Sequence, residues 1–162
     1  MEFSERKDAH VESEERRRLR FLESEGKWVF HGSGSHLEKL EPRQAHNYSE
    51  ARAESGIPDD KPAVFATPYA DIAIFMAVVS PKNVKNLRAG FSSFGEKKFE
   101  FRATSETMNQ LDQAKGYVYV FGKEGFVPRG DSEMLSYETV MPSEVIEVGK
   151  QDLPLNIIIK NF

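Results

Sequence analysis

The stretch "WVFHGSGSHLEKLEP", residues 28–42, decides the fold of this chain. Three apolar residues at its start predict a short buried strand, and His31 stands at the expected end of that strand. Gly32 then opens a flexible Gly-Ser-Gly-Ser turn, in which a ligand can approach the backbone because glycine has no Cβ. A capping-box spacing predicts a short helix after Ser35. Since a histidine at a strand end is more often structural than catalytic, the other segments must decide the role of His31.

Length and composition indicate one globular domain. The chain has 162 residues, of which 39% are hydrophobic and 30% are charged, and this is enough for a sizeable core. It has no cysteine and a formal net charge of −4. The first property excludes thiolate nucleophiles and fits a reducing cytoplasm, and the second disfavours nucleic acid as the main partner. No apolar run approaches the ~20 residues that a membrane helix needs, and the charged N-terminus does not resemble a secretory signal.

The first 26 residues differ in composition from the rest. They are almost all polar, and acidic residues stand four positions before arginines, as Glu12 does before Arg16, which favours a helix. Leu19 and Leu22 give this helix a short apolar edge. We therefore expect a charged helical extension over residues 1–26, which either binds a partner or packs on a domain formed by residues 27–162.

Two further segments predict strands that carry candidate functional residues. "AVFAT", residues 63–67, predicts a strand that is followed by a largely buried helix in "PYADIAIFMAVVS", residues 68–80. "SEMLSYETV", residues 132–140, predicts a strand that begins at Glu133. Because side chains alternate along a strand, Glu133 and Glu138 point to opposite faces, and only one of them can enter a given cleft.

These three segments, in this order, resemble the three signature strands of the ADP-ribosyltransferase fold, in the branch of poly(ADP-ribose) polymerases and diphtheria toxin. The resemblance rests on "WVFHGS", "AVFATPYADIAIFMA" and "SEMLSYETV", which lie between residues 28 and 140. The chain also resembles small bacterial and phage proteins that carry similar motifs. The resemblance implies an α+β fold with two packed, mostly antiparallel sheets, a central cleft and a few flanking helices.

The resemblance also implies a role for individual residues, with NAD as a substrate. His31 corresponds to the histidine that holds a ribose hydroxyl of NAD. Gly32 corresponds to the residue whose backbone binds the nicotinamide carboxamide, and Ser33 completes that motif. Phe75 falls where a ring stacks on nicotinamide, and Tyr69 can supply a ring from another direction. Glu133 corresponds to the catalytic glutamate, whose carboxylate stabilises the oxocarbenium-like charge of the transition state.

The sequence departs from this family at two positions. Val64 replaces the usual aromatic residue of the second motif, and Ile72 stands where the polymerases have a serine that bonds the carboxamide. One lost hydrogen-bond donor costs about 1–3 kcal/mol of binding. We therefore expect weak binding of NAD, in the micromolar to millimolar range, and a slow or narrowly specific enzyme.

Three functions remain open from the sequence. The first is transfer of ADP-ribose from NAD to an unknown acceptor. The second is a degenerate module that binds a nucleotide or a protein, and the third is an RNA 2′-phosphotransferase, for which Arg43 and Arg129 are the candidate phosphate ligands. No histidine spacing predicts a metal site. The segment from Arg43 to Lys61 is expected to cover the cleft as a lid, and the sequence leaves the oligomeric state open.

Overall fold

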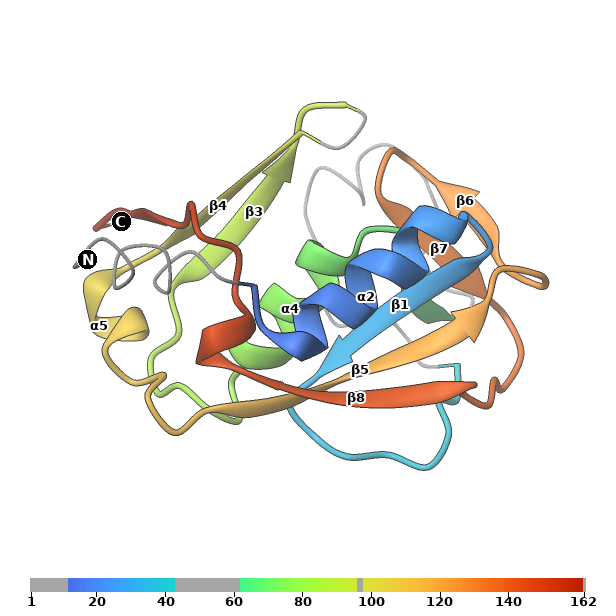
Figure 1. The fold of residues 1–162 in the computed structure, drawn as a ribbon, viewed down its shortest axis with the longest axis horizontal. Coiled ribbons are helices and arrows are strands. Elements are labelled where there is room, and N and C mark those ends of the chain that lie inside the picture. Colours follow the sequence, from blue (N-terminus) through green and yellow to red (C-terminus); the bar gives the residue numbers. More distant parts are fainter. Residues whose placement is uncertain (1–11, 43–61, 96–97, 162) are drawn as a thin grey trace, which may run out of the picture.

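The computed structural model describes residues 12–42, 62–95 and 98–161, and the expected lid over residues 43–61 lies outside them. Figure 1 shows the fold and labels most of its helices and strands. The helices are α2 (Glu14–Glu25), α4 (Ala70–Val78), α5 (Ser105–Met108) and the 3₁₀-helix η1 (Lys150–Asp152). The strands are β1 (Trp28–Ser33), β2 (Val64–Ala66), β3 (Ala89–Ser93), β4 (Phe99–Ala103), β5 (Lys115–Gly122), β6 (Val127–Arg129), β7 (Glu133–Ser136), β8 (Glu144–Gly149) and β9 (Ile158–Ile159).

The described strands form three small sheets. Their orders are β1-β5-β8, β2-β7-β6 and β3-β4-β9, and every pair is antiparallel except β4 with β9. The α+β class is therefore confirmed, with one sheet more than the two expected. One isolated backbone bridge joins the first two sheets, where Phe30 and Thr67 exchange hydrogen bonds of 2.7 and 2.8 Å. Beyond this bridge β1 and β2 diverge, so they do not form one continuous sheet.

The β1-β5-β8 sheet is covered on both faces. Phe30, Val118 and Val120 belong to one core cluster, which also contains apolar residues of α2 and α4. Val29 and Tyr119, whose side chains point the opposite way, belong to a second cluster with residues of β2 and β7. Helices therefore cover one face, and the β2-β7-β6 sheet covers the other.

Helix α4 lies unusually close to the sheet beneath it. A Cβ added at Gly32 would lie 2.9 Å from Ala73 C and 2.9 Å from Ala77 N, and still closer to the Ala73 carbonyl oxygen. A Cβ at Gly116 would meet the Ala77 backbone in the same way. Two glycines on neighbouring strands and two alanines on the helix thus permit this approach.

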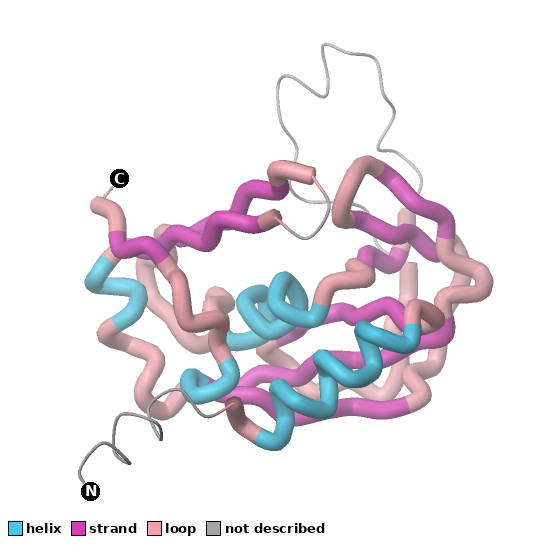
Figure 2. The backbone as a smooth tube through the Cα atoms, turned by 45° about the horizontal axis from the view of Figure 1, so that its top comes forward, coloured by secondary structure: helices cyan, strands magenta, loops and turns pink. Residues whose placement is uncertain are grey.

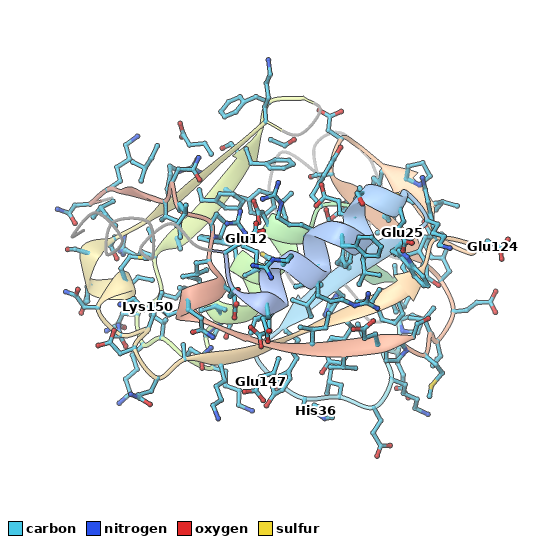
Figure 3. All side chains as sticks on the ribbon, viewed as in Figure 1. Glu12, Glu25, His36, Glu124, Glu147 and Lys150 are labelled. Carbon is cyan, nitrogen blue, oxygen red and sulfur yellow. The ribbon has the colours of Figure 1, made fainter. Side chains whose placement is uncertain are left out.

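Helix α2 is part of the same packed body (Figure 1). Leu19 and Leu22 are 0% and 3% exposed and lie in the core cluster that contains α4. The Glu23 carboxylate accepts the N–H of Ala70 at 2.8 Å, at the start of α4. Figure 3 labels Glu25, whose carboxylate accepts the indole N–H of Trp28 at 2.8 Å where α2 leads into β1. Residues 14–25, expected as an extension, thus share their core with the residues that follow.

Local structure differs from the sequence-based expectation around the first motif. β1 continues through Gly32 to Ser33, so His31 lies within the strand and faces Tyr119 of β5, rather than standing at the strand end. The residues after Ser35 form no helix, because the Tyr119 hydroxyl donates to the Ser35 carbonyl at 2.7 Å and Leu40 bridges to Val140.

Within the described residues, no helix is both long and apolar enough to cross a membrane.

Candidate functional site

A cavity of about 310 Å³ opens where β1 and β2 diverge. The β3 strand and the β6–β7 hairpin bound it from two sides, and Figures 1 and 2 show these two elements standing apart from one another. Segments far apart in the chain therefore meet here. The lining residues are Phe30, His31, Gly32, Phe65, Ala66, Thr67, Ile72, Ala73, Met76, Phe91, Arg129, Gly130, Asp131, Ser132 and Glu133.

His31 is held in one orientation by the neighbouring sheet. Its Nδ1 lies 2.6 Å from the carbonyl oxygen of Phe65 in β2. Because a carbonyl can only accept, Nδ1 carries the hydrogen, and the lone pair of the neutral ring is at Nε2. The ring also lies 6.1 Å from the ring of Tyr119, centroid to centroid, at a tilt of 55°. Burial is the main cause that raises the pKa of the Tyr119 hydroxyl, so this neighbour is a neutral phenol near pH 7.

Gly32 contributes its backbone to the cavity and its bare Cα to helix α4. In an antiparallel strand, the N–H and C=O groups of successive residues point to alternate edges. Phe30 directs both groups away from β5, toward Thr67, so Gly32, two residues on, directs its own groups to that same edge. At that edge Gly32 borders the cavity instead of another strand. Among the described residues, none outside the β1–β5 ladder forms a hydrogen bond with the N–H or C=O of Gly32.

Glu133 begins β7 and lies at the cavity with a fixed partner. The β6–β7 register sets it opposite Arg129, whose Nε donates to Glu133 Oε1 at 2.8 Å. Three residues connect this pair, and Gly130 takes a left-handed φ of 67° there, which glycine adopts at no steric cost. Glu138 lies beyond β7, is exposed and does not line the cavity.

Thr67 is a cavity residue that local sequence patterns did not single out. Thr67 directly follows β2, whose last residue, Ala66, pairs with Met134, the neighbour of Glu133. Thr67 and Glu133 both line the cavity, and Thr67 is only 6% exposed. Its hydroxyl oxygen accepts the N–H of Tyr69 at 3.2 Å, while its hydroxyl hydrogen is available for donation. The strand register would have revealed this residue, but the register is a tertiary property.

The two expected stacking rings do not line the cavity. Phe75 is 2% exposed, and its ring lies 4.9 Å from the ring of Phe101 in the core. Helical phase explains this, because Ile72, Ala73 and Met76 occupy the face of α4 that lines the cavity. Tyr69, just before α4, packs its ring 4.8 Å from Phe99. The expectation that these two rings face a ligand is therefore corrected.

Ser33 lies next to the first cavity, in a second one of about 520 Å³. His31 and Phe65 line both cavities, so the two adjoin across these side chains. The Ser33 hydroxyl accepts the N–H of Ser35 at 3.1 Å. The second cavity carries more polar groups, among them His36, which Figure 3 labels on the loop after β1.

The walls of the first cavity are mainly apolar away from the hairpin. Ile72 and Met76 of α4 line it together with Phe91 of β3. Met76 is 48% exposed although it is large and apolar. These side chains suit a flat, weakly polar group such as an aromatic ring. Within the described part of the chain, no three His, Asp or Glu side chains cluster in a way that would hold a metal ion.

Comparisons of this chain with protein-family models, curated proteins and solved structures found no match.

Proposed function

We propose that this protein is an NAD-dependent ADP-ribosyltransferase. One observation carries the proposal: His31, the backbone edge of Gly32 and Glu133 line a single cavity, although they come from strands far apart in the sequence. Each of them offers a group that cleavage of NAD requires. These are a hydrogen-bond partner for a ribose hydroxyl, an amide clamp and a carboxylate.

The nicotinamide carboxamide matches the edge of β1. An amide has one acceptor oxygen and an NH₂ donor, and Gly32 offers an N–H and a C=O on the same strand edge. A ligand that bonds both groups continues the strand pairing that ends at the bridge between Phe30 and Thr67. The apolar side chains of Ile72, Met76 and Phe91 then surround the pyridine ring. Ile72 has no hydroxyl to bond the carboxamide, but Thr67 lines the same cavity and its hydroxyl group can take this role.

His31 joins the two halves of the site. It lines both the mainly apolar cavity and the adjoining, more polar one. A dinucleotide has a matching division into a weakly polar nicotinamide end and a polar remainder. The imidazole, fixed by its bond to Phe65, is suited to bond a ribose hydroxyl between them.

The chemistry assigns the central step to Glu133. The bond between the ribose C1′ and the nicotinamide nitrogen breaks, and its electron pair neutralises the charge of the pyridinium ring. Positive charge then develops on the ribose, as in glycoside hydrolysis, and a carboxylate next to the ribose stabilises it. The acceptor nucleophile forms a bond to C1′ and loses a proton. A carboxylate that acts mainly in the transition state raises the rate more than the affinity.

Release of nicotinamide from NAD, measured at millimolar NAD, tests this function. The Glu133→Gln variant keeps the shape of the side chain but loses its charge. We expect the rate of release to fall on the order of 100-fold or more while the affinity for NAD, measured by calorimetry, changes little.

Glu138→Gln is the matched control, because Glu138 is exposed, lies beyond the end of β7 and does not line the cavity. This variant is expected to retain the wild-type rate. If folded wild-type protein gives neither binding heat nor nicotinamide, the transferase function is excluded. Tight binding of NAD without release would instead identify a dinucleotide-binding module.

A further inference from the structure

Arg129 is the nearest charged partner of the Glu133 carboxylate in the cavity. Its Nε donates to Glu133 Oε1 at 2.8 Å, and the two residues stand directly opposite one another in the β6–β7 register. Their side chains are 28% and 38% exposed. The backbone of the hairpin fixes both ends of this pair, so it differs from a salt bridge between two mobile surface chains.

A second contact restrains the guanidinium. Its central carbon lies 5.6 Å from the centroid of the Phe65 ring, which is within the range of a cation–π interaction. The backbone of the same Phe65 accepts the hydrogen bond from His31. Phe65 thus supports Arg129 with its side chain and His31 with its carbonyl group, on the two sides of the cavity.

The 2.8 Å hydrogen bond from Arg129 engages Oε1 of Glu133. The other oxygen of this carboxylate, Oε2, can accept a hydrogen bond from a ligand in the cavity. A glutamate that is not held loses side-chain entropy when it becomes ordered. A carboxylate that is already oriented avoids this cost at the moment of reaction.

We propose that Arg129 is a positioning residue, which orients Glu133 so that one carboxylate oxygen faces the cavity. Arg129 acts through Glu133 and does not itself contact the reacting atoms. The effect on rate rests on the proposed transferase function, whereas the orientation of Glu133 is a property of the ligand-free protein. The two are therefore tested separately.

The first test is a double-mutant cycle on nicotinamide release. We expect Arg129→Gln to lower kcat on the order of 10- to 100-fold with little change in KM. Arg129→Lys, which keeps the charge but not the planar donor group, is expected to give an intermediate rate. In the Glu133→Gln background, Arg129→Gln is expected to have no further effect. A full additional loss in that background, or a change confined to KM, would overturn the proposal.

Arg102→Gln is the matched control for this cycle. Arg102 pairs with Glu100 at 3.2 Å, at 25% and 39% exposure, and neither residue lines the cavity. Its removal breaks an equally exposed ion pair, and kcat is expected to stay at the wild-type value. An equal loss of kcat in this control would show that Arg129 has only a structural role.

The second test needs no catalysis. ¹³C relaxation of labelled glutamate side chains measures the order of Glu133, whose signal is identified by its absence from Glu133→Gln. We expect Glu133 to be ordered in the wild type, less ordered in Arg129→Lys and mobile in Arg129→Gln, with thermal unfolding confirming that each variant is folded. Equal order in all three proteins would refute the positioning role. If the wild type releases no nicotinamide, the transferase function fails, and this measurement still decides the role of Arg129.

Discussion

Gly32 serves both the packing of α4 and the cavity, through different parts of the residue. Its missing Cβ lets the backbone of α4 approach β1, while its N–H and C=O point along the plane of the sheet toward the cavity. The sequence suggested that this glycine makes room for a ligand. The structure assigns that room to the helix, because a Cβ stands perpendicular to the sheet and the hydrogen-bonding groups lie within it.

A substitution at this position separates these two roles. Gly32→Ala would place its Cβ 2.9 Å from backbone atoms of Ala73 and Ala77, which cannot rotate away. We expect the free energy of unfolding to fall by about 3 kcal/mol, measured by urea denaturation. Gly122→Ala is the control, because a Cβ there meets nothing within 4 Å and should leave the stability unchanged or slightly raised. Equal stability of both variants would contradict the close packing of α4.

Ile72 allows a gain-of-binding prediction. It is 3% exposed and lines the cavity that we assign to nicotinamide. Ile72→Ser supplies the hydroxyl donor that the polymerases have at this position, and we expect it to bind nicotinamide on the order of ten times more tightly than Ile72→Ala. Calorimetric titration of both variants measures this difference.

The alanine variant is the appropriate reference, because both substitutions remove most of the buried side chain and both destabilise the core. The comparison therefore isolates the hydroxyl group. Equal affinity of the two variants would show that position 72 does not face the carboxamide.

At the scale of elements, one buried carboxylate connects the start of α2 with η1. Asp152 of η1 is 0% exposed and accepts the Gly149 N–H at 2.7 Å. It also bonds the hydroxyl of Ser13, the N-cap of α2. Burial is the main cause that raises the pKa of Asp152, while the bonds from Ser13 and Gly149 act in the opposite direction.

This carboxylate gives the stability of the protein a pH dependence. Because the pKa of Asp152 is raised above its ordinary value of 3.8, the folded protein binds this proton more tightly than the unfolded chain does. The resulting stabilisation is complete below the unfolded pKa and is lost as the pH rises through the folded pKa. We expect the stability advantage of the wild type over Asp152→Asn to shrink as the pH rises above about 4, as measured by urea denaturation.

Ser13→Ala provides a control for the sign of this effect. The Ser13 hydroxyl favours the charged carboxylate, as does nearby Arg16, whereas Glu15 opposes it. Loss of the hydroxyl should move the transition to higher pH. A wild-type advantage that grows with pH would show that hydrogen bonding, rather than burial, dominates at Asp152.

For the molecule as a whole, the decisive question is whether residues 27–162 fold without α2. Leu19 and Leu22 are buried in the common core, and truncation of two such side chains alone costs about 4–10 kcal/mol. Deletion of residues 1–26 also removes the Glu23 carboxylate from the start of α4 and the Arg16–Asp71 ion pair of 3.0 Å. We expect the shortened chain to lose cooperative thermal unfolding and the dispersed amide signals of a folded protein.

A synthetic peptide of residues 12–26 is expected to restore this folding when it is added to the shortened chain. A shortened chain that unfolds cooperatively at the wild-type temperature would show instead that α2 is a separable extension.

Some parts of this fold follow directly from local sequence patterns. Acidic residues four positions before arginines predict a helix in the first segment, and α2 occupies Glu14–Glu25 there, with Ser13 as its N-cap and Gly26 as its C-cap. The apolar run after Pro68 predicts a buried helix, which is α4. The strand expected from Glu133 onward is present as β7, although it ends at Ser136 and so does not reach Glu138. These features depend on neighbours within a few residues.

Other features are decided only when distant segments meet. The pattern after Ser35 permits a helix, but the Tyr119 hydroxyl and the bridge to Val140 hold the chain in a loop. The position of Phe75 in the core depends on which face of α4 meets β3 and β4, a choice that an all-round apolar helix leaves open.

The sequence by itself determined the α+β class and the segments that carry His31, Gly32 and Glu133, because periodicity and turn residues act locally. Tertiary structure alone decided that these residues share one cavity and that Thr67 and Arg129 join them. The physical reason is strand register: hydrogen bonds between β2, β6 and β7 set which side chains stand opposite one another, and no local pattern encodes that choice.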